Sequence, residues 1–281
     1  MPANLKRSLS LPLVTFYGIG TILGAGIYVL VGKVAGFAGM FTPFAFLLAS
    51  LLAALSAFSY AELSARFPKS AGEAVYVQEG LGWRKLSIIV GVSIVFAGII
   101  SVATLVHGFV GYFQVFVDVP AVVVIICLTL LMGLVVAWGI NESVIIASVM
   151  TLLEIGGLVL IIWVARESFH LLPERWPEMV PPLEVAAWGG IVAGSFIAFY
   201  AFIGFEDIVN VAEEVRNPHR NLPRAIVIAL VVTSLFYFFV AVVSILTLAP
   251  AELARTDAPL AEIYQHVTGQ RPLVITIISL V

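Results

Sequence analysis

Glycine residues interrupt the first long apolar segment of the chain at close intervals. Four of them fall within residues 18–28, which include the run Gly24-Ala25-Gly26. Glycine lets the backbone leave helical geometry and lets a ligand approach it closely. Unwinding here would free N–H groups at the start of a half-helix, where the positive end of the helix dipole suits a carboxylate. The alternative is helix packing, because Gly20-x-x-x-Gly24 is also a motif of close helix contacts.

A second glycine lies in a later aromatic-rich segment, shortly before two carboxylates. Residues 199–207 read Phe-Tyr-Ala-Phe-Ile-Gly-Phe-Glu-Asp. Freed carbonyls at this break would attract a cation or an ammonium group, and the aromatic side chains would exclude water or contact an organic substrate. Carboxylates at membrane depth are seldom present without a cavity, a partner or a titration role. The alternative places both at the membrane rim, but Glu206 precedes Arg216 by ten positions, so we expect Glu206 inside the protein and Asp207 to be structural.

A third carboxylate, Glu154, lies in the middle of an apolar segment with no basic residue nearby in sequence. Desolvation disfavours the charged form of such a group, so Glu154 could alternate between neutral and charged states, as proton coupling requires. The alternative is a permanently protonated carboxyl that is hydrogen-bonded to a neighbouring helix. We expect the acids near the segment ends to be structural: these are Glu62, Glu73, Glu79, Glu213 and Glu214.

Long apolar segments must position these residues. Hydrophobic residues make up 61% of the 281 residues and charged residues only 11%, against roughly 25% in ordinary soluble domains. A membrane-spanning helix needs about 20 apolar residues, and its backbone groups must be satisfied internally. We therefore expect an all-α polytopic membrane protein with about seven complete transmembrane helices and the start of an eighth, at which the chain looks truncated. The seven segments are 11–34, 41–63, 86–117, 120–138, 143–165, 187–212 and 223–249.

The two glycine breaks fall in the first and sixth of these segments. They are five spans apart, an odd number, so the second break enters the membrane from the opposite side, as an inverted-topology repeat requires. We expect one transmembrane domain over residues 1–281, with one repeat at 11–165 and an incomplete second repeat at 187–281. Lys and Arg divide nine to five between the two sides, which predicts a cytoplasmic N-terminus.

Motifs for other chemistries are missing from the sequence. It contains no HExxH, GxSxG or Walker-type pattern, and its four histidines are scattered. The single cysteine, Cys127, excludes a disulfide framework within the chain. We therefore expect no enzyme activity, no metal centre, no cofactor and no nucleic-acid partner.

Three motifs, taken together, resemble the amino acid-polyamine-organocation superfamily of transporters. The motifs span residues 20–28, 59–76 and 201–226, and the resemblance covers essentially the whole chain. It implies a five-plus-five inverted-repeat, leucine-transporter-like fold in which helices 1 and 6 are discontinuous. It also implies that the substrate is an amino acid or a related amine.

The resemblance also implies roles for individual residues. The N–H groups of Ala25 and Gly26, beside Gly24, would receive the substrate carboxylate. Glu206 matches a position at which some relatives carry a glutamate implicated in pH sensing. Glu154 departs from relatives with a lysine in the fifth helix that stands in for sodium, so we expect proton or cation coupling at Glu154 and Glu206. The substrate ammonium would be received by the carbonyls of Ile22, Tyr200 and Ile203, near Gly204, with Tyr200 and Phe202 at the substrate or its gate.

Together these features predict a secondary active transporter that works by alternating access. Coupling would be to protons or by exchange, with Na⁺ as the other candidate ion. The expected partners are a small-molecule amine and the lipid bilayer, with the protein in a cytoplasmic or plasma membrane; the sequence does not specify an oligomeric state. The alternatives are a channel, a non-transporting membrane interaction protein, or an inactive fragment of a permease.

Overall fold

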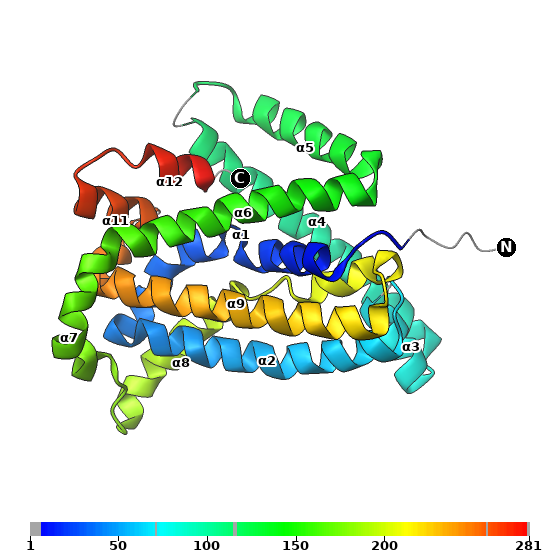
Figure 1. Ribbon diagram of the computed structural model, residues 1–281, viewed down its shortest axis with the longest axis horizontal. Helices are drawn as coiled ribbons and strands as arrows, with labels where there is room; N and C mark the ends of the chain where they lie inside the picture. Colours follow the sequence, from blue (N-terminus) through cyan, green and yellow to red (C-terminus); the bar gives the residue numbers. More distant parts are fainter. Residues whose placement is uncertain (1–6, 71, 115–116, 257, 280–281) are drawn as a thin grey trace.

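A computed structural model describes residues 7–70, 72–114, 117–256 and 258–279, which form a bundle of helices (Figure 1). Within these residues the only extended pairing is one parallel bridge between Leu9 and Val215. The longer helices are α1 (Leu11–Ala38), α2 (Thr42–Arg66), α4 (Arg84–Gln114), α5 (Ala121–Trp138), α6 (Ile140–Val164), α8 (Val185–Tyr200) and α9 (Pro218–Thr247). The shorter ones are α3 (Gly72–Leu81), α7 (Leu172–Met179), α10 (Pro250–Leu253), α11 (Pro259–Thr268) and α12 (Leu273–Ile278), with 3₁₀ turns η1 (Gly39–Phe41), η2 (Ala165–Leu171) and η3 (Glu206–Glu214).

The long helices overlap the predicted apolar segments, although α8 ends at Tyr200 within the predicted segment 187–212, and this confirms the all-helical, polytopic membrane class. Five stretches of the described chain are long and apolar enough to cross a membrane. These are Gly26–Arg66, Arg84–His107, Ala121–Trp138, Glu142–Met179 and Pro218–Thr247. Two shorter apolar helices, Leu11–Gly24 and Trp188–Tyr200, each end at a predicted break.

Helix α9 occupies the centre of the bundle and packs against both α1 and α2 (Figure 1). Small residues let these helices approach closely, because alanine recurs at every fourth position on the buried face of α2. The alanines are Ala45, Ala49, Ala53, Ala57 and Ala61, none of them more than 7% exposed. Gly194 of α8 fits between Ala38 and Ala45 for the same reason.

Helices α4 and α5 lie at the edge of the bundle and expose many large apolar side chains, such as Ile88, Phe96 and Leu134. A soluble protein would rarely expose so extensive an apolar surface. In a membrane protein this surface suits contact with lipid.

The segments between the predicted spans contain short helices. Residues 65–83 include α3, and residues 167–184 include most of η2 and all of α7. Helix α9 begins at Pro218, earlier than the predicted 223, because Asn217 takes a left-handed conformation (φ 49°) and Pro218 is suited to the first helical position.

Candidate functional site

The first break lies in α1 at Gly24. This residue has φ +22°, a conformation that L side chains rarely adopt, and helical geometry resumes after it. A Cβ placed on Gly24 would meet nothing within 4 Å, so the backbone conformation alone favours glycine here. The break therefore presents the N-terminal end of a second half-helix, with the donor groups and dipole that favour an anion.

The second break follows the end of α8 at Tyr200. Residues 201–205 form turns before η3, and Gly204 has φ +129°. A Cβ on Gly204 would overlap the backbone carbonyl of Thr21 in α1. The Gly204 N–H donates to Glu206 Oε2 at 2.8 Å, and the Gly204 carbonyl accepts a hydrogen bond from Thr21 Oγ1 at 2.9 Å. Both polar groups of Gly204 are therefore already satisfied.

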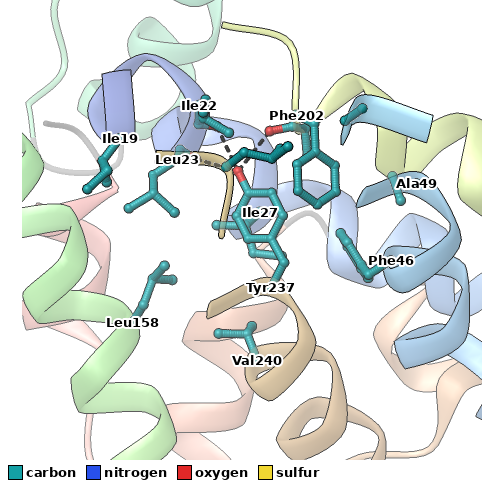
Figure 2. Packing of buried hydrophobic residues seen from close by; sticks show 14 of the residues in the cluster. Ile19, Ile22, Leu23, Ile27, Phe46, Ala49, Leu158, Phe202, Tyr237 and Val240 are labelled. Atoms are coloured by element: carbon teal, nitrogen blue, oxygen red, sulfur yellow. Dashed lines mark hydrogen bonds between the residues drawn. The ribbon is translucent and has the colours of Figure 1, made fainter. Parts of the chain in front are cut away.

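The two breaks meet at the hydroxyl of Tyr237, a fully buried residue of α9 (Figure 2). This oxygen lies 2.7 Å from the Ile22 carbonyl oxygen and 2.8 Å from that of Ala201. One hydroxyl carries one proton, so it can donate fully to only one of these carbonyls at a time. The Tyr237 ring packs against Phe46 and Phe202, with ring centroids 5.7 and 4.9 Å away.

Sequence reasoning missed Tyr237. A tyrosine within the apolar run of α9 has the pattern of an ordinary core residue. The signal that could have identified it is its hydroxyl, because a buried tyrosine usually finds a hydrogen-bond partner, and helical backbone offers few free carbonyls away from a break.

The other predicted site residues lie around this junction in different settings. Phe202 is fully buried against Tyr237, whereas Tyr200 is 57% exposed and Ile203 44% exposed. The Tyr200 carbonyl accepts a hydrogen bond from the Ile203 N–H at 3.3 Å. Gly26 packs directly on Ala201, while the side chain of Ala25 lies outside the described part of the structure. These predicted site residues therefore lie close to the junction of the two breaks, and their roles in substrate binding stay predictions.

The two predicted coupling carboxylates lie at different breaks. Glu154 of α6 is 9% exposed, and its backbone carbonyl accepts a hydrogen bond from the Tyr28 hydroxyl of α1 at 2.7 Å. Glu206 instead turns back to cap Gly204 in the second break.

The described residues offer no metal centre, because they contain no group of three or more His, Cys, Asp or Glu side chains placed to hold an ion. A mostly apolar pocket lies beside the second half of α1. Its lining consists of Tyr28, Ala258, Leu260, Ala261, Pro272, Ile275, Thr276 and Ser279.

Comparison with known proteins gives the chain a family. The family model described as amino acid permease matches residues 9–281. The branched-chain amino acid permease of Bacillus subtilis (strain 168) is 29% identical, over 93% of this chain and 59% of its own length. The vacuolar cationic amino acid transporter 2 of Arabidopsis thaliana is 34% identical, over 93% of this chain and 44% of its own length.

A methylthioribose transporter of Bacillus subtilis (strain 168) is 30% identical over 85% of this chain and 55% of its own length. The chain therefore spans about half the length of the curated relatives that it matches. Their names refer to branched-chain amino acids, cationic amino acids and methylthioribose, so similarity by itself does not select a substrate.

Proposed function

Because the chain belongs to the amino acid permease family, we propose that it carries the substrate site of a secondary active transporter for amino acids or related amines. The observation that carries the proposal is the contact between the two helix breaks at Thr21, Gly204 and Tyr237. Broken helices that meet inside a bundle offer backbone donors and acceptors together, which suits a zwitterion.

The substrate carboxylate is assigned to the N-terminal end of the second half of α1, at Gly24, Ala25 and Gly26. The half-helix dipole and the N–H groups at this end supply a partial positive charge. The substrate ammonium group is assigned to carbonyls of the two breaks, including those of Ile22 and Ile203. The Tyr237 hydroxyl lies within hydrogen-bond distance of the Ile22 carbonyl, whose oxygen can accept two hydrogen bonds, so an ammonium group at Ile22 would share that oxygen with Tyr237 or bind it alone when the hydroxyl donates to Ala201.

The proposed architecture is an inverted repeat in which α1 and the pair α8 and η3 are equivalent discontinuous helices. The proposed orientation places the N-terminus in the cytoplasm, on the side with more Lys and Arg residues. Coupling to protons or a cation is assigned to Glu154 and Glu206, one at each break.

The test is uptake of a panel of labelled amino acids and amines by proteoliposomes that contain the full chain encoded by the gene. Transport should be saturable, and an inward proton gradient should stimulate it. The Glu154→Gln variant keeps the size of the side chain and removes its charge, so it should lose the stimulation. Glu142→Gln, at an exposed position near the start of the same helix, is the matched control and should retain it.

Two outcomes would contradict parts of this proposal. Absence of uptake for every amine in the panel would exclude the substrate class. Gradient-stimulated uptake that survives Glu154→Gln unchanged would exclude Glu154 as the coupling group and leave the substrate class intact.

A further inference from the structure

The segment that precedes α1 is not helical, and it lies against a part of the chain that is distant in sequence. We call this segment the strap and define it as residues 7–10, which lead directly into α1 at Leu11. The strap pairs with residues 214–216, at the end of η3 and just before α9. It therefore joins the start of α1 to the end of the segment that follows the second break.

Backbone hydrogen bonds hold the strap in place. The Leu9 N–H donates to the Glu214 carbonyl at 3.0 Å, and the Arg216 N–H donates to the Leu9 carbonyl at 2.9 Å. The Arg216 guanidinium donates from Nε to the Arg7 carbonyl at 3.4 Å. Both arginines are exposed, so water can take over these hydrogen bonds when the strap detaches.

Two buried side chains anchor the strap more firmly than its few hydrogen bonds do. Leu9 and Val215 form the parallel bridge, and each of them is 0% exposed. Both belong to the hydrophobic core of the bundle. Detachment would bring apolar surface into contact with water, so the attached form is favoured until another interaction offsets this cost.

Further contacts continue from the strap to the two breaks. Gly18 of α1 packs on Ile208 of η3, where a Cβ on the glycine would overlap the Ile208 side chain. At the breaks, Thr21 donates to the Gly204 carbonyl. The first half of α1 is therefore held against η3 and its flanking residues at three points, of which the strap is the farthest from the breaks.

Gly24 lets the first half of α1 move as a unit. Its backbone has left helical geometry, and no atom lies within 4 Å of a Cβ built on it, so a change of direction here displaces no neighbour. Hinges are typically a few residues at the ends of elements that absorb such a change. The length of chain from the strap to Gly24 therefore resembles a lever with a hinge at one end and a fastening at the other.

One contact with α6 also has to yield in this movement. The Thr151 hydroxyl lies 3.3 Å from the Phe16 carbonyl oxygen of α1. The same hydroxyl lies 2.8 Å from the Ala147 carbonyl oxygen of its own helix. Thr151 therefore keeps a hydrogen-bond partner when α1 moves away.

We propose that the strap is a latch that holds the first half of α1 against η3 and must detach in each transport cycle. This inference rests on the proposed transport function and adds to it the contact that closes one end of the substrate path. With the strap attached, the first half of α1 is closed against η3. With the strap detached, this half turns about Gly24, and water reaches Ile208.

The first test fastens the strap with a removable cross-link. Paired strands lie about 4.8 Å apart, within the range of Cα separations that a disulfide spans, so Leu9→Cys and Val215→Cys can be joined. The native cysteine, Cys127, is exposed and is first replaced by serine. In proteoliposomes that contain the full chain encoded by the gene, oxidation should abolish amino acid uptake and reduction should restore it.

Each single-cysteine variant, treated with the same oxidant, is the matched control and should keep its uptake. Uptake that continues at the starting rate after complete cross-linking would overturn the latch and leave the proposed function intact.

The second test does not depend on transport. A reporter cysteine is introduced by Ile208→Cys, at a position that is 0% exposed, and its labelling by a water-soluble maleimide is timed in detergent micelles. Leu9→Ala removes most of the buried strap side chain and should accelerate labelling severalfold. Ser8→Ala changes the neighbouring strap residue, whose side chain is only partly buried, and should leave the rate unchanged.

A second reporter separates detachment of the strap from general loss of structure. Ala53→Cys lies on the buried face of α2, far along the chain from the strap, and its slow labelling should not respond to Leu9→Ala. Equal acceleration at both reporters, or none at Ile208→Cys, would contradict the latch. If the wild type takes up no amine, the proposed function fails, and the labelling rates still decide whether the strap holds α1 against η3.

Discussion

Both helix breaks interrupt an apolar segment at a glycine with positive φ, but they differ in how that glycine is packed. In α1 the helix leaves regular geometry at Gly24 alone, and the space where a Cβ would lie is empty. In the second break, residues 201–205 are turned, and Gly204 lies against the Thr21 backbone with both of its polar groups bonded. The first break therefore requires glycine for its backbone conformation alone, whereas the second is also closed by side chains of the protein itself.

This difference indicates how the junction is stabilised. Glu206 closes the second break from within, Thr21 closes it from α1, and Tyr237 bridges the two breaks from α9. A ligand that approaches the Gly204 N–H would compete with Glu206 for it, and one that approaches the Gly204 or Ala201 carbonyl would share that oxygen with Thr21 or Tyr237.

Gly204→Ala is expected to have the largest effect of the substitutions that test this difference between the two breaks. The substitution combines a strained positive φ with an overlap on the Thr21 carbonyl, so the free energy of unfolding should fall by roughly 2–6 kcal/mol. Thermal unfolding in detergent micelles measures the effect, and Gly133→Ala, at an open position in α5, should change little. Equal stability of the two variants would refute the close approach between the breaks.

A smaller loss is expected for Gly24→Ala. The positive φ still imposes backbone strain, but no neighbouring atom is displaced, so the decrease should be about 1–3 kcal/mol. The same unfolding assay ranks it against Gly204→Ala. Gly24 is expected to require glycine only for its backbone conformation, and Gly204 also for lack of space. A Gly24→Ala variant that is less stable than Gly204→Ala would contradict this distinction.

Tyr237→Phe separates the bridging hydroxyl from the ring that carries it. The ring contacts with Phe46 and Phe202 stay, while two buried carbonyls lose their donor, so stability should fall by about 1–2 kcal/mol. Substrate affinity, measured by equilibrium binding, should change as well because the Ile22 carbonyl becomes free. Tyr264→Phe on α11, outside both breaks, should leave affinity unaltered; if both variants behave alike, the bridge has no role in binding.

The smallest effect is expected for Thr21→Val, which keeps the shape of the side chain and removes its hydroxyl. The Gly204 carbonyl then loses one hydrogen bond, and stability should fall by about 1 kcal/mol. Thr21→Ser retains the hydroxyl and should restore the wild-type value in the unfolding assay. A valine variant as stable as the wild type would show that the hydroxyl contributes nothing at this position.

The sequence by itself determined the membrane class, the positions of the apolar helices and the two glycines that break them. These features depend on local properties of the sequence. A long apolar run indicates a helix that spans the membrane, and glycine allows the backbone to leave helical geometry. Gly24 and Gly204 were identified for this reason. The short helices between the spans were missed, because helix α3 is neither long nor strongly apolar.

Only the tertiary structure decided what meets at the breaks. Tyr237 lies far along the chain from Ile22, and Thr21 lies far from Gly204, so no local pattern connects either pair. Whether a hydroxyl bridges two carbonyls depends on how helices pack in three dimensions. The contacts at Tyr237 and between Thr21 and Gly204 arise from that packing, which residue type alone does not specify.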